Sequence, residues 1–452
     1  MRKKYFLFIV LPLQILTAQC WQSATASRYG CAVVADNGSL WSWGNNAFGE
    51  LGISVTGGIR NIPTQTGSDL DWKSISENSI LQYALKNDGT LWSWGLNNYG
   101  QLGQGNTTNS NTPTKIGTDN DWKYVYAGKN QEFVLAIKNN GTLWAWGRND
   151  SRQLGLGDNF ARTVPTQVGS DTNWKSLTVG SYYALGLKTD GTLWAWGDNG
   201  SGQLGFGDFA TRTIPTQVGV SNDWNNIYSG YNHVIGIKND GTLWVWGYNG
   251  YGQLGLGDLT SRNTPTQLTS ITGVQKINTS TDSTYFIKSD GTLWVFGRNN
   301  YGQLGLNDFT DRNTPTQLGI ENNWQDISGG FYHVLSLKTD GTLWSWGYNN
   351  FGQLGDGTTV NKSLPVSVNC PAVLGIDENE LVSLKLYPNP SHSVINFSQG
   401  METLELYDFT GKKIKYYENI NVIDITEFEN GLYLLKGKTT SGAIFNQKII
   451  KK

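Results

Sequence analysis

The sequence predicts an all-β protein, a seven-bladed β-propeller followed by a small β-sandwich domain. Three observations lead to the propeller. The pentapeptide Leu-Trp-x-Trp-Gly occurs in seven copies, the sixth with Phe296 in place of the second Trp, the copies start 50 to 52 residues apart, and a short turn signal precedes each copy. The copies begin at Leu40, Leu91, Leu143, Leu193, Leu243, Leu293 and Leu343. Self-similarity with this period indicates a repeat architecture, in which each copy is one supersecondary unit.

The bulk composition agrees with short strands joined by tight turns. At 452 residues the chain is too long for one compact core, and its 56 Gly and 12% aromatic residues are typical of β-rich repeats. The formal net charge is −2, and beyond residues 1–19 the sequence has no long basic run. This charge argues against nucleic acid and anionic membranes as partners.

The N-terminus reads as a secretory signal peptide over residues 1–19. Three basic residues at positions 2–4 precede a mostly apolar stretch over 5–16, which is too short for a transmembrane helix. Cys20 follows and could be a lipid-anchor site or a plain new N-terminus, although the large Gln19 before it disfavours lipidation. We therefore expect an exported protein, either secreted or held at the outer-membrane surface.

One copy, residues 174–219, shows how a unit becomes a blade. Strands are expected at 174–177, 183–188, 192–197 and 215–218. Asp190-Gly191 reads as a two-residue hairpin turn in which both residues need positive φ. Other copies hold Asn-Gly or Asp-Gly in the same place. Four short antiparallel strands per unit, repeated seven times, predict a propeller with seven blades.

The Trp residues are predicted to be core. Alternation along the third strand places Trp194 and Trp196 on one face, and Leu193 and Ala195 on the other. The Trp face of one blade would pack on the Leu and small-residue face of its neighbour, so the array is stable only as a whole. All 19 Trp belong either to this motif or to the residue that opens a repeat, which favours packing over an aromatic ligand cage.

The unit Asp-Gly-Thr-Leu-Trp-x-Trp-Gly-x-Asn-x-x-Gly-Gln-Leu-Gly, as at 240–255, resembles the regulator-of-chromosome-condensation repeat. The resemblance covers about residues 20–370 and implies a seven-bladed propeller. The best-known member of that family is a nuclear exchange factor for a small GTPase. This chain differs from it by the signal peptide, by the lack of a basic tail and by the lack of a long blade insertion. The repeat therefore carries over, and the exchange activity does not.

Alignment of the copies suggests how the ring is closed. Cys20 falls where Asp223 lies in an interior copy, and Cys370 falls where Val220 lies, three residues away. We hypothesise a Cys20–Cys370 disulfide that joins the first blade to the last, which an exported protein permits. The alternative is two unpaired thiols. Cys31 aligns with a buried strand position and reads as a small core residue.

The tail is predicted to be a separate module, with a linker at 371–380 and a sorting domain at 381–452. Short apolar segments between turns suggest about seven strands in a β-sandwich. Four ordered motifs, ending at the last residue, resemble the C-terminal sorting domain of the type IX secretion system of Bacteroidetes-type bacteria. Its motif residues here are Pro388, Asn389, Pro390, Gly411, Gly431, Lys451 and Lys452. The resemblance implies the type IX machinery as a partner; the alternative is a structural β-domain with a solvated basic end.

No cofactor, metal site or catalytic constellation is predicted. The sequence shows no nucleophile elbow, zinc-spaced cluster or phosphate loop. His233 and His333 share one repeat position that holds Gly, Leu, Phe, Tyr or Ser in the other copies, a mixture that argues against a metal ring. Four copies contain Asp-x-x-x-Arg, as at Asp158 and Arg162, which we interpret as loop salt bridges.

The copies differ most between the first two strands, and this stretch lies on one rim of a propeller. Its Tyr, His, Asn, Arg and acidic residues suit sugars or a protein surface. The candidate ligand-binding residues are Arg28, Tyr29, Glu77, Asn78, Lys129, Glu132, Tyr182, Tyr231, His233, Asp282, Tyr332 and His333. The alternative is neutral variation in an exposed loop.

Two functions fit these features. The first is a secreted or surface-displayed binding module whose ligand is a glycan or a protein held on this rim. The second is a secreted polysaccharide-active enzyme, a lyase or a hydrolase, on a propeller scaffold. An enzyme would need converging carboxylates or a His–acid pair, and the uniform copies supply only scattered ones. The sequence therefore favours binding over catalysis.

The disulfide hypothesis predicts a Cys20–Cys370 cross-link in the exported protein. Peptide mapping without reductant should recover the two cysteines in one linked pair, which separates after reduction. Recovery of both residues as free thiols would end the hypothesis.

Overall fold

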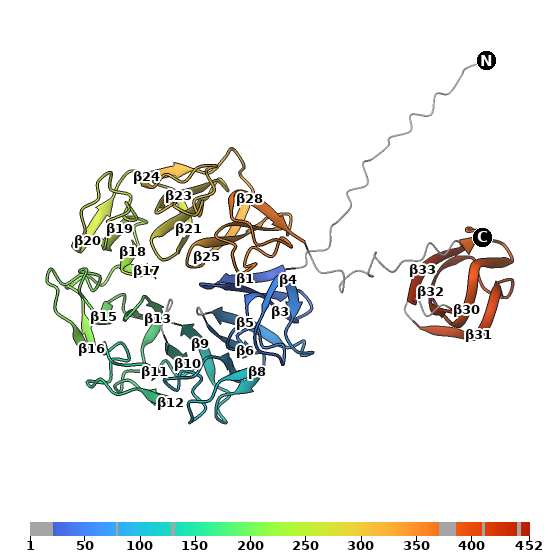
Figure 1. Ribbon diagram of the computed structural model, residues 1–452, viewed down its shortest axis with the longest axis horizontal. Helices are drawn as coiled ribbons and strands as arrows, with labels where there is room; N and C mark the ends of the chain where they lie inside the picture. The colour runs from blue at the N-terminus through green and yellow to red at the C-terminus, as the bar shows by residue number, and fades with distance from the viewer. Residues whose placement is uncertain (1–20, 78–79, 128–131, 370–385, 409–411, 441–443) are drawn as a thin grey trace, which may run out of the picture. The chain divides into compact units, whose positions relative to one another are not determined.

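A computed structural model describes residues 21–77, 80–127, 132–369, 386–408, 412–440 and 444–452. Cys20 and Cys370 lie outside these ranges. The chain divides into two compact units, Met1–Asn369 and Cys370–Lys452. The first unit is a ring of seven four-stranded antiparallel sheets, the predicted blades (Figure 1). Each blade is built from one continuous stretch of chain, and its strands follow one another outward from the centre of the ring.

The first four blades share this order. Blade 1 has β1 (Trp21–Ala26), β2 (Gly30–Ala35), β3 (Leu40–Asn45) and β4 (Ile59–Gln65). Blade 2 has β5 (Trp72–Glu77), β6 (Leu81–Lys86), β7 (Leu91–Gly95) and β8 (Ser110–Lys115). Blade 3 has β9 (Trp122–Ala127), β10 (Phe133–Lys138), β11 (Leu143–Gly147) and β12 (Arg162–Gln167). Blade 4 has β13 (Trp174–Val179), β14 (Tyr183–Lys188), β15 (Leu193–Gly197) and β16 (Arg212–Gln217).

The remaining three blades repeat this strand order. Blade 5 has β17 (Trp224–Ser229), β18 (His233–Lys238), β19 (Leu243–Gly247) and β20 (Arg262–Leu268). Blade 6 has β21 (Val274–Thr279), β22 (Ser283–Lys288), β23 (Leu293–Gly297) and β24 (Arg312–Gln317). Blade 7 has β25 (Trp324–Gly329), β26 (His333–Lys338), β27 (Leu343–Gly347) and β28 (Lys362–Val368). The sequence prediction of four strands per copy is confirmed.

The hairpin turn between the second and third strands differs from the expected type. Only Gly191 of the Asp190-Gly191 pair has positive φ, at 82°. The amide of Lys188 donates to the carbonyl of Thr192, and the amide of Gly191 donates to the carbonyl of Lys188, so the loop contains three residues. The expectation of a two-residue turn was wrong. Asp190 serves instead as an acceptor, because its Oδ1 receives the amide (3.0 Å) and hydroxyl (2.7 Å) of Thr192.

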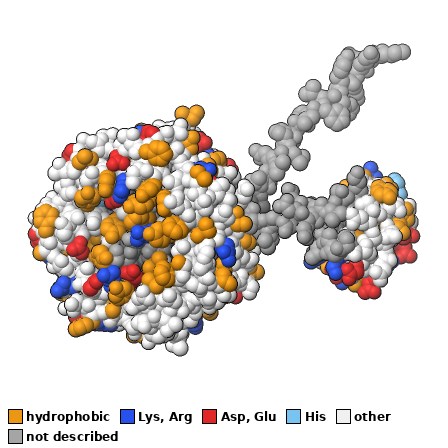
Figure 2. All heavy atoms as spheres, viewed as in Figure 1, with side chains coloured by type: hydrophobic (Ala, Val, Ile, Leu, Met, Phe, Trp, Pro, Cys, Tyr) orange, Lys and Arg blue, Asp and Glu red, His pale blue; other side chains and the backbone are white. Residues whose placement is uncertain are grey.

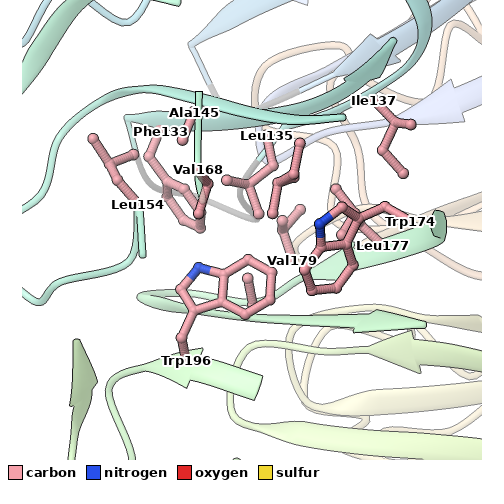
Figure 3. Close-up of a cluster of buried hydrophobic side chains, with 12 residues drawn as sticks. Phe133, Leu135, Ile137, Ala145, Leu154, Val168, Trp174, Leu177, Val179 and Trp196 are labelled. Carbon is pink, nitrogen blue, oxygen red and sulfur yellow. The ribbon is translucent and has the colours of Figure 1, made fainter. Parts of the chain in front are cut away.

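The core lies between blades, as the alternation of Trp and Leu predicted. Trp196 of blade 4 is fully buried against Leu135, Leu154 and Val168 of blade 3 (Figure 3). Its indole Nε1 donates to the Gln153 carbonyl of blade 3 at 3.0 Å. The same bond joins Trp43 to Gln353, Trp94 to Glu50, Trp146 to Gln101, Trp246 to Gln203 and Trp346 to Gln303.

The loop between the third and fourth strands, residues 148–161 in blade 3 and called here the Gly-rich loop, holds the Gln153 carbonyl in place. Asn149 receives the amide of Leu154 at its Oδ1 and donates from Nδ2 to the Asp158 carbonyl, both at 3.0 Å. Arg162 then pairs with Asp158 at 2.6 Å, the predicted loop salt bridge. Gly155 has a φ of 71°, and a Cβ there would lie 2.9 Å from the Trp196 ring. The loop therefore needs glycine both for its backbone and for the indole that it contacts.

The sixth copy keeps the accepting carbonyl satisfied without a Trp. Phe296 replaces the second Trp, and its side chain has no N–H to donate. The Oγ1 of Thr284 donates to the Gln253 carbonyl at 2.9 Å instead. The ring closes through the same contacts as its other joints, because Trp43 of blade 1 bonds to Gln353 of blade 7. The Phe331 amide also donates to the Ser27 carbonyl at 2.9 Å across this joint.

The second unit is a small β-domain with its own core. Its described strands form one antiparallel sheet, fewer strands than the seven expected: β29 (Leu386–Tyr387), β30 (Val394–Asp408), β31 (Lys413–Asp424), β32 (Gly431–Thr439) and β33 (Ile444–Lys451). The long β30 pairs with β29, β31 and β32 along different parts of its length. Ile395, Leu404, Leu406 and Ile449 are buried in the core.

Replacing Trp196 tests the inter-blade core. Trp196→Ala removes a fully buried indole and leaves the Gln153 carbonyl without its donor. We expect a loss of about 3–5 kcal/mol in the free energy of unfolding, measured by denaturant melts. A loss below about 1 kcal/mol would contradict the core assignment.

Candidate functional site

The rim that carries the variable loops is formed by two segments of each blade. One is the loop between the first two strands, and the other is the residue after the Gly that ends the third-strand motif. A backbone hydrogen bond joins them: the Arg148 amide donates to the Glu132 carbonyl at 2.7 Å, and the Tyr348 amide donates to that of Tyr332 at 2.8 Å. Two positions that vary among the copies therefore lie side by side in each blade.

Seven aromatic side chains from blades 1, 5, 6 and 7 form a connected group on this rim, the aromatic cluster. Its members are Tyr29, Tyr231, Tyr301, Phe331, Tyr332, Tyr348 and Phe351. Ring centroids lie 4.3 Å apart for Phe331 and Tyr332, 4.7 Å for Tyr332 and Tyr301, and 4.9 Å for Tyr301 and Tyr348. All seven are partly exposed, so they present ring surface to a ligand.

Two arginines lie within this cluster. The Arg28 guanidinium stands 4.6 Å from the ring centre of Tyr29 and 4.5 Å from that of Phe331. Arg298 lies 5.1 Å from the Tyr332 ring and pairs with Asp282 at 3.4 Å. These cation–π contacts fix both guanidinium groups against flat surfaces.

Asp282 is the carboxyl group within the cluster region. Burial raises its pKa, and the neighbouring Arg298 charge counteracts that shift. Burial also raises the pKa of the Tyr332 hydroxyl, to which Arg298 donates at 3.3 Å. Arg298 thus ties an acid of blade 6 to a tyrosine of blade 7.

A smaller group lies on blades 2 to 4. The Arg148 guanidinium stands 4.9 Å from the Tyr99 ring and 5.4 Å from the Tyr182 ring. It also pairs with Glu132 at 3.3 Å and Asp150 at 2.6 Å. This group has fewer aromatic residues than the aromatic cluster and more negative charge.

A cavity of about 240 Å³ lies at the rim end of the inner strands. Residues near the ends of β1, β5, β13 and β25 line it, together with Arg28 and Phe331 from the loops. Figure 2 shows one face of the ring, on which hydrophobic side chains, here including Tyr and Phe, gather around the middle with charged side chains among them.

The two histidines of the predicted site are buried. His233 and His333 are 0% exposed, because each begins the second strand of its blade and faces the next blade. The His333 Nε2 lies 3.1 Å from the Cys31 Sγ, and the His233 Nε2 lies 3.2 Å from the Thr284 Oγ1. Their expected place on the exposed rim was wrong, and the proposals below do not use them.

The other predicted residues divide between the two groups. Arg28, Tyr29, Tyr231, Asp282 and Tyr332 belong to the region of the aromatic cluster, whereas Glu132 and Tyr182 belong to the smaller group. Asn78, Lys129 and the Glu77 side chain lie outside the described residues.

Sequence reasoning missed the contribution of the loop after the third strand. This loop supplies Arg148, Arg298, Tyr301, Tyr348 and Phe351 to the two groups. The signal was present, because the residue after the final Gly of the motif reads Asn, Leu, Arg, Asp, Tyr, Arg and Tyr in the seven copies. Only the pairing of the two loops shows that this variation belongs to the same surface.

Two further observations concern the described residues. They contain no group of three His, Cys, Asp or Glu side chains placed to hold a metal ion. They also contain no helix with the length and apolar character needed to cross a membrane.

Comparison with protein families identifies both units. The regulator of chromosome condensation (RCC1) repeat matches residues 88–135, 140–187, 190–237, 240–287, 290–337 and 340–375. The secretion system C-terminal sorting domain matches residues 385–452. The sorting domain points to export by type IX secretion, to the medium or to the outer-membrane surface, and implies interaction with the type IX machinery.

Individual relatives are similar over short stretches. The X-linked retinitis pigmentosa GTPase regulator homolog of Caenorhabditis elegans is 35% identical over 82 residues, which are 18% of this chain and 6% of that protein. Human probable E3 ubiquitin-protein ligase HERC3 is 30% identical over 93 residues, 20% of this chain and 9% of that protein. The chain therefore spans less than a tenth of the length of these two curated relatives.

Solved structures share the fold of the first unit. The structure described as Kap60 bound to yeast RCC1 (Prp20) matches with a TM-score of 0.67 and 20% identity, over 82% of this chain and 90% of that one. The predicted seven-bladed propeller is thus confirmed as the fold.

His333 predicts a loss of stability in acid. Burial lowers its pKa from 6.5 to about 3, so the unfolded chain binds a proton that the folded chain excludes. The contribution of neutral His333 to the free energy of unfolding is fully present above pH 6.5 and falls as the pH drops towards 3. His333→Tyr introduces the residue that blade 4 holds there, Tyr183, and should reduce the loss measured by denaturant melts between about pH 7 and about pH 4.5. An equal loss of stability in both proteins would show that His333 is not the source of the acid sensitivity.

Proposed function

This chain belongs to the regulator of chromosome condensation repeat family and carries a secretion sorting domain, and we propose from this premise that it is an exported binding protein with its ligand site on the variable rim. The site is the aromatic cluster of blades 1, 5, 6 and 7 with Arg28 and Arg298. Exposed aromatic rings and arginines are the side chains that contribute most to binding energy at recognition surfaces.

The observation that carries the proposal is the mutual contact of these side chains across blades. The cluster runs without a break from Tyr231 of blade 5, through Phe331 and Tyr332, to Tyr29 of blade 1. Neutral variation in exposed loops would give no reason for aromatic and arginine residues from four blades to contact one another. Among the described rim residues, the smaller group on blades 2 to 4 has more acidic residues and fewer rings, which supports a site on one side of the ring.

The export route rests on the two ends of the chain. We propose that residues 1–19 direct the first membrane passage and that the sorting domain directs the second. Within the domain, the first and last motifs lie together, because the Asn389 Oδ1 accepts the Ile450 amide at 2.9 Å and Ser391 pairs with Lys451. Gly411 lies outside the described residues. The first and last motifs thus lie side by side, and we propose that the machinery binds them together.

The enzymatic alternative, a polysaccharide lyase or hydrolase, lacks such an observation. A glycosidase needs two carboxyl groups about 5–10 Å apart across the scissile bond. Asp282 and Glu132 belong to different blades, and each is paired with its own arginine. The experiment below also tests this alternative.

Binding of the purified protein to a panel of glycans and bacterial surface polymers tests the proposal. The cluster variant is Tyr301→Ser, Tyr332→Asn and Tyr348→Asn, each introducing a residue that another copy holds at that position. We expect it to lose binding. The matched control, Tyr99→Ser with Tyr182→Asn, alters the smaller group in the same way and should bind like the original protein.

Equal binding by all three proteins would place the ligand elsewhere and reduce the rim variation to drift. Release of new reducing or unsaturated sugar ends during incubation would favour the enzyme instead.

A further inference from the structure

The central cavity differs from the rim around it in having one identifiable charge. Among its described lining residues, Arg28 is the charged one, and the rest are hydroxyl, amide, small or aromatic residues. Its volume of about 240 Å³ lies below the range of about 300–1,000 Å³ for sites of drug-sized ligands. The cavity therefore suits a small molecule or one residue of a polymer.

Arg28 occupies a repeat position that the copies fill differently. Blades 4 to 7 hold Ser181, Tyr231, Thr281 and Phe331 at this position, two residues before the second strand. Phe331 and Thr281 line the cavity with Arg28. Among these five described copies, the positive charge thus enters from blade 1 alone.

Two aromatic rings contact the guanidinium of Arg28. It lies between the rings of Tyr29 and Phe331, at 4.6 and 4.5 Å from their centres. A guanidinium presents its N–H donors in a rigid fork that matches both oxygens of a carboxylate. Stacking on two rings removes much of the conformational freedom that a long side chain would lose on binding.

Two acids of the rim are already paired with arginines. Asp282 pairs with Arg298 at 3.4 Å and Glu132 pairs with Arg148 at 3.3 Å. An anion entering the cavity would therefore not face these two carboxylates as bare charges.

The walls supply hydroxyl groups suited to a sugar. The Ser328 Oγ accepts the Ala26 amide at 3.0 Å, and the Ser76 Oγ accepts the Ala127 amide at 3.3 Å. A hydroxyl that accepts still has a hydrogen to donate, so each serine can bond to a ligand oxygen. Tyr231 and Phe331 add ring faces near the same opening, on which the apolar face of a sugar can stack.

We infer that the cavity binds a carboxylate-bearing sugar residue of an acidic polysaccharide, with its carboxylate on Arg28 and its ring near Phe331. This inference rests on the proposed rim function and names its ligand class. The neighbouring sugar residues of the polymer would then lie over the aromatic cluster.

Calorimetric titration of the full chain with oligogalacturonate tests the inference. The methyl ester of the same oligomer serves as the neutral ligand, and a polyglutamate peptide serves as a non-sugar carboxylate. Arg28→Ser introduces the residue of blade 4. The control Arg60→Ser removes an arginine from β4, the outermost strand of the same blade, and introduces the residue that blade 2 holds there, Ser110.

We expect oligogalacturonate to bind the original protein and Arg60→Ser equally. Arg28→Ser should weaken this binding about 10- to 100-fold, the effect of losing a charged hydrogen-bonded pair. The methyl ester should bind all three proteins weakly, and so should polyglutamate. Matching thermal melts of the two variants would show that folding is not the cause.

Several results would overturn the inference. Equal binding of oligogalacturonate to Arg28→Ser and the original protein would remove Arg28 from the site. Preference for polyglutamate would indicate a protein partner. Binding of neutral glycans that depends on Tyr332 but not on Arg28 would overturn the inference and leave the rim function standing. The absence of binding by any glycan, acidic or neutral, would overturn both.

Discussion

The structure depends on one repeated interaction, the indole N–H of a buried Trp bonded to a loop carbonyl of the preceding blade. Trp196 and Gln153 show it in blades 4 and 3. The bond sets the distance between adjacent sheets while the ring of the Trp fills the space between them. Because Trp43 makes it to Gln353 as well, the last joint closes like the interior ones. Where the Phe296 side chain cannot donate, Thr284 donates to the Gln253 carbonyl, so this buried acceptor keeps a donor.

This uniform scaffold explains why the proposed binding residues lie where the copies differ. Strands, turns and the Gly-rich loop serve packing in every blade, and substitutions there would weaken a joint. The rim positions do not take part in this packing, so each blade can present a different side chain there. The hydrogen bond between the two rim segments places two variable positions side by side, and in blade 6 these positions hold Asp282 and Arg298.

Much of the fold could be predicted from the sequence, because period and alternation are local properties. The Trp core, the four strands of each blade and the rim that bears the loops followed from them. The predicted turn type at Asp190-Gly191 was wrong, because the same dipeptide also fits a three-residue loop with one glycine at positive φ. The predicted exposure of His333 on the rim was wrong, because alternation does not tell on which face of the sheet the first residue of a strand lies. Arg298 and Tyr348 were missed because their contacts join loops that are distant in sequence.

The central claim is that residues needed for folding recur in every copy, whereas residues needed for binding are confined to one part of the rim. A scan of single substitutions through residues 21–369, sorted once for folded protein and once for binding to the best glycan of the panel, tests it directly. The account predicts that folding losses recur about every 50 residues at the Trp and Gly positions. Binding losses in folded protein should gather on the rim of blades 1, 5, 6 and 7. Binding losses that recur in all seven copies, or gather on another surface, would contradict it.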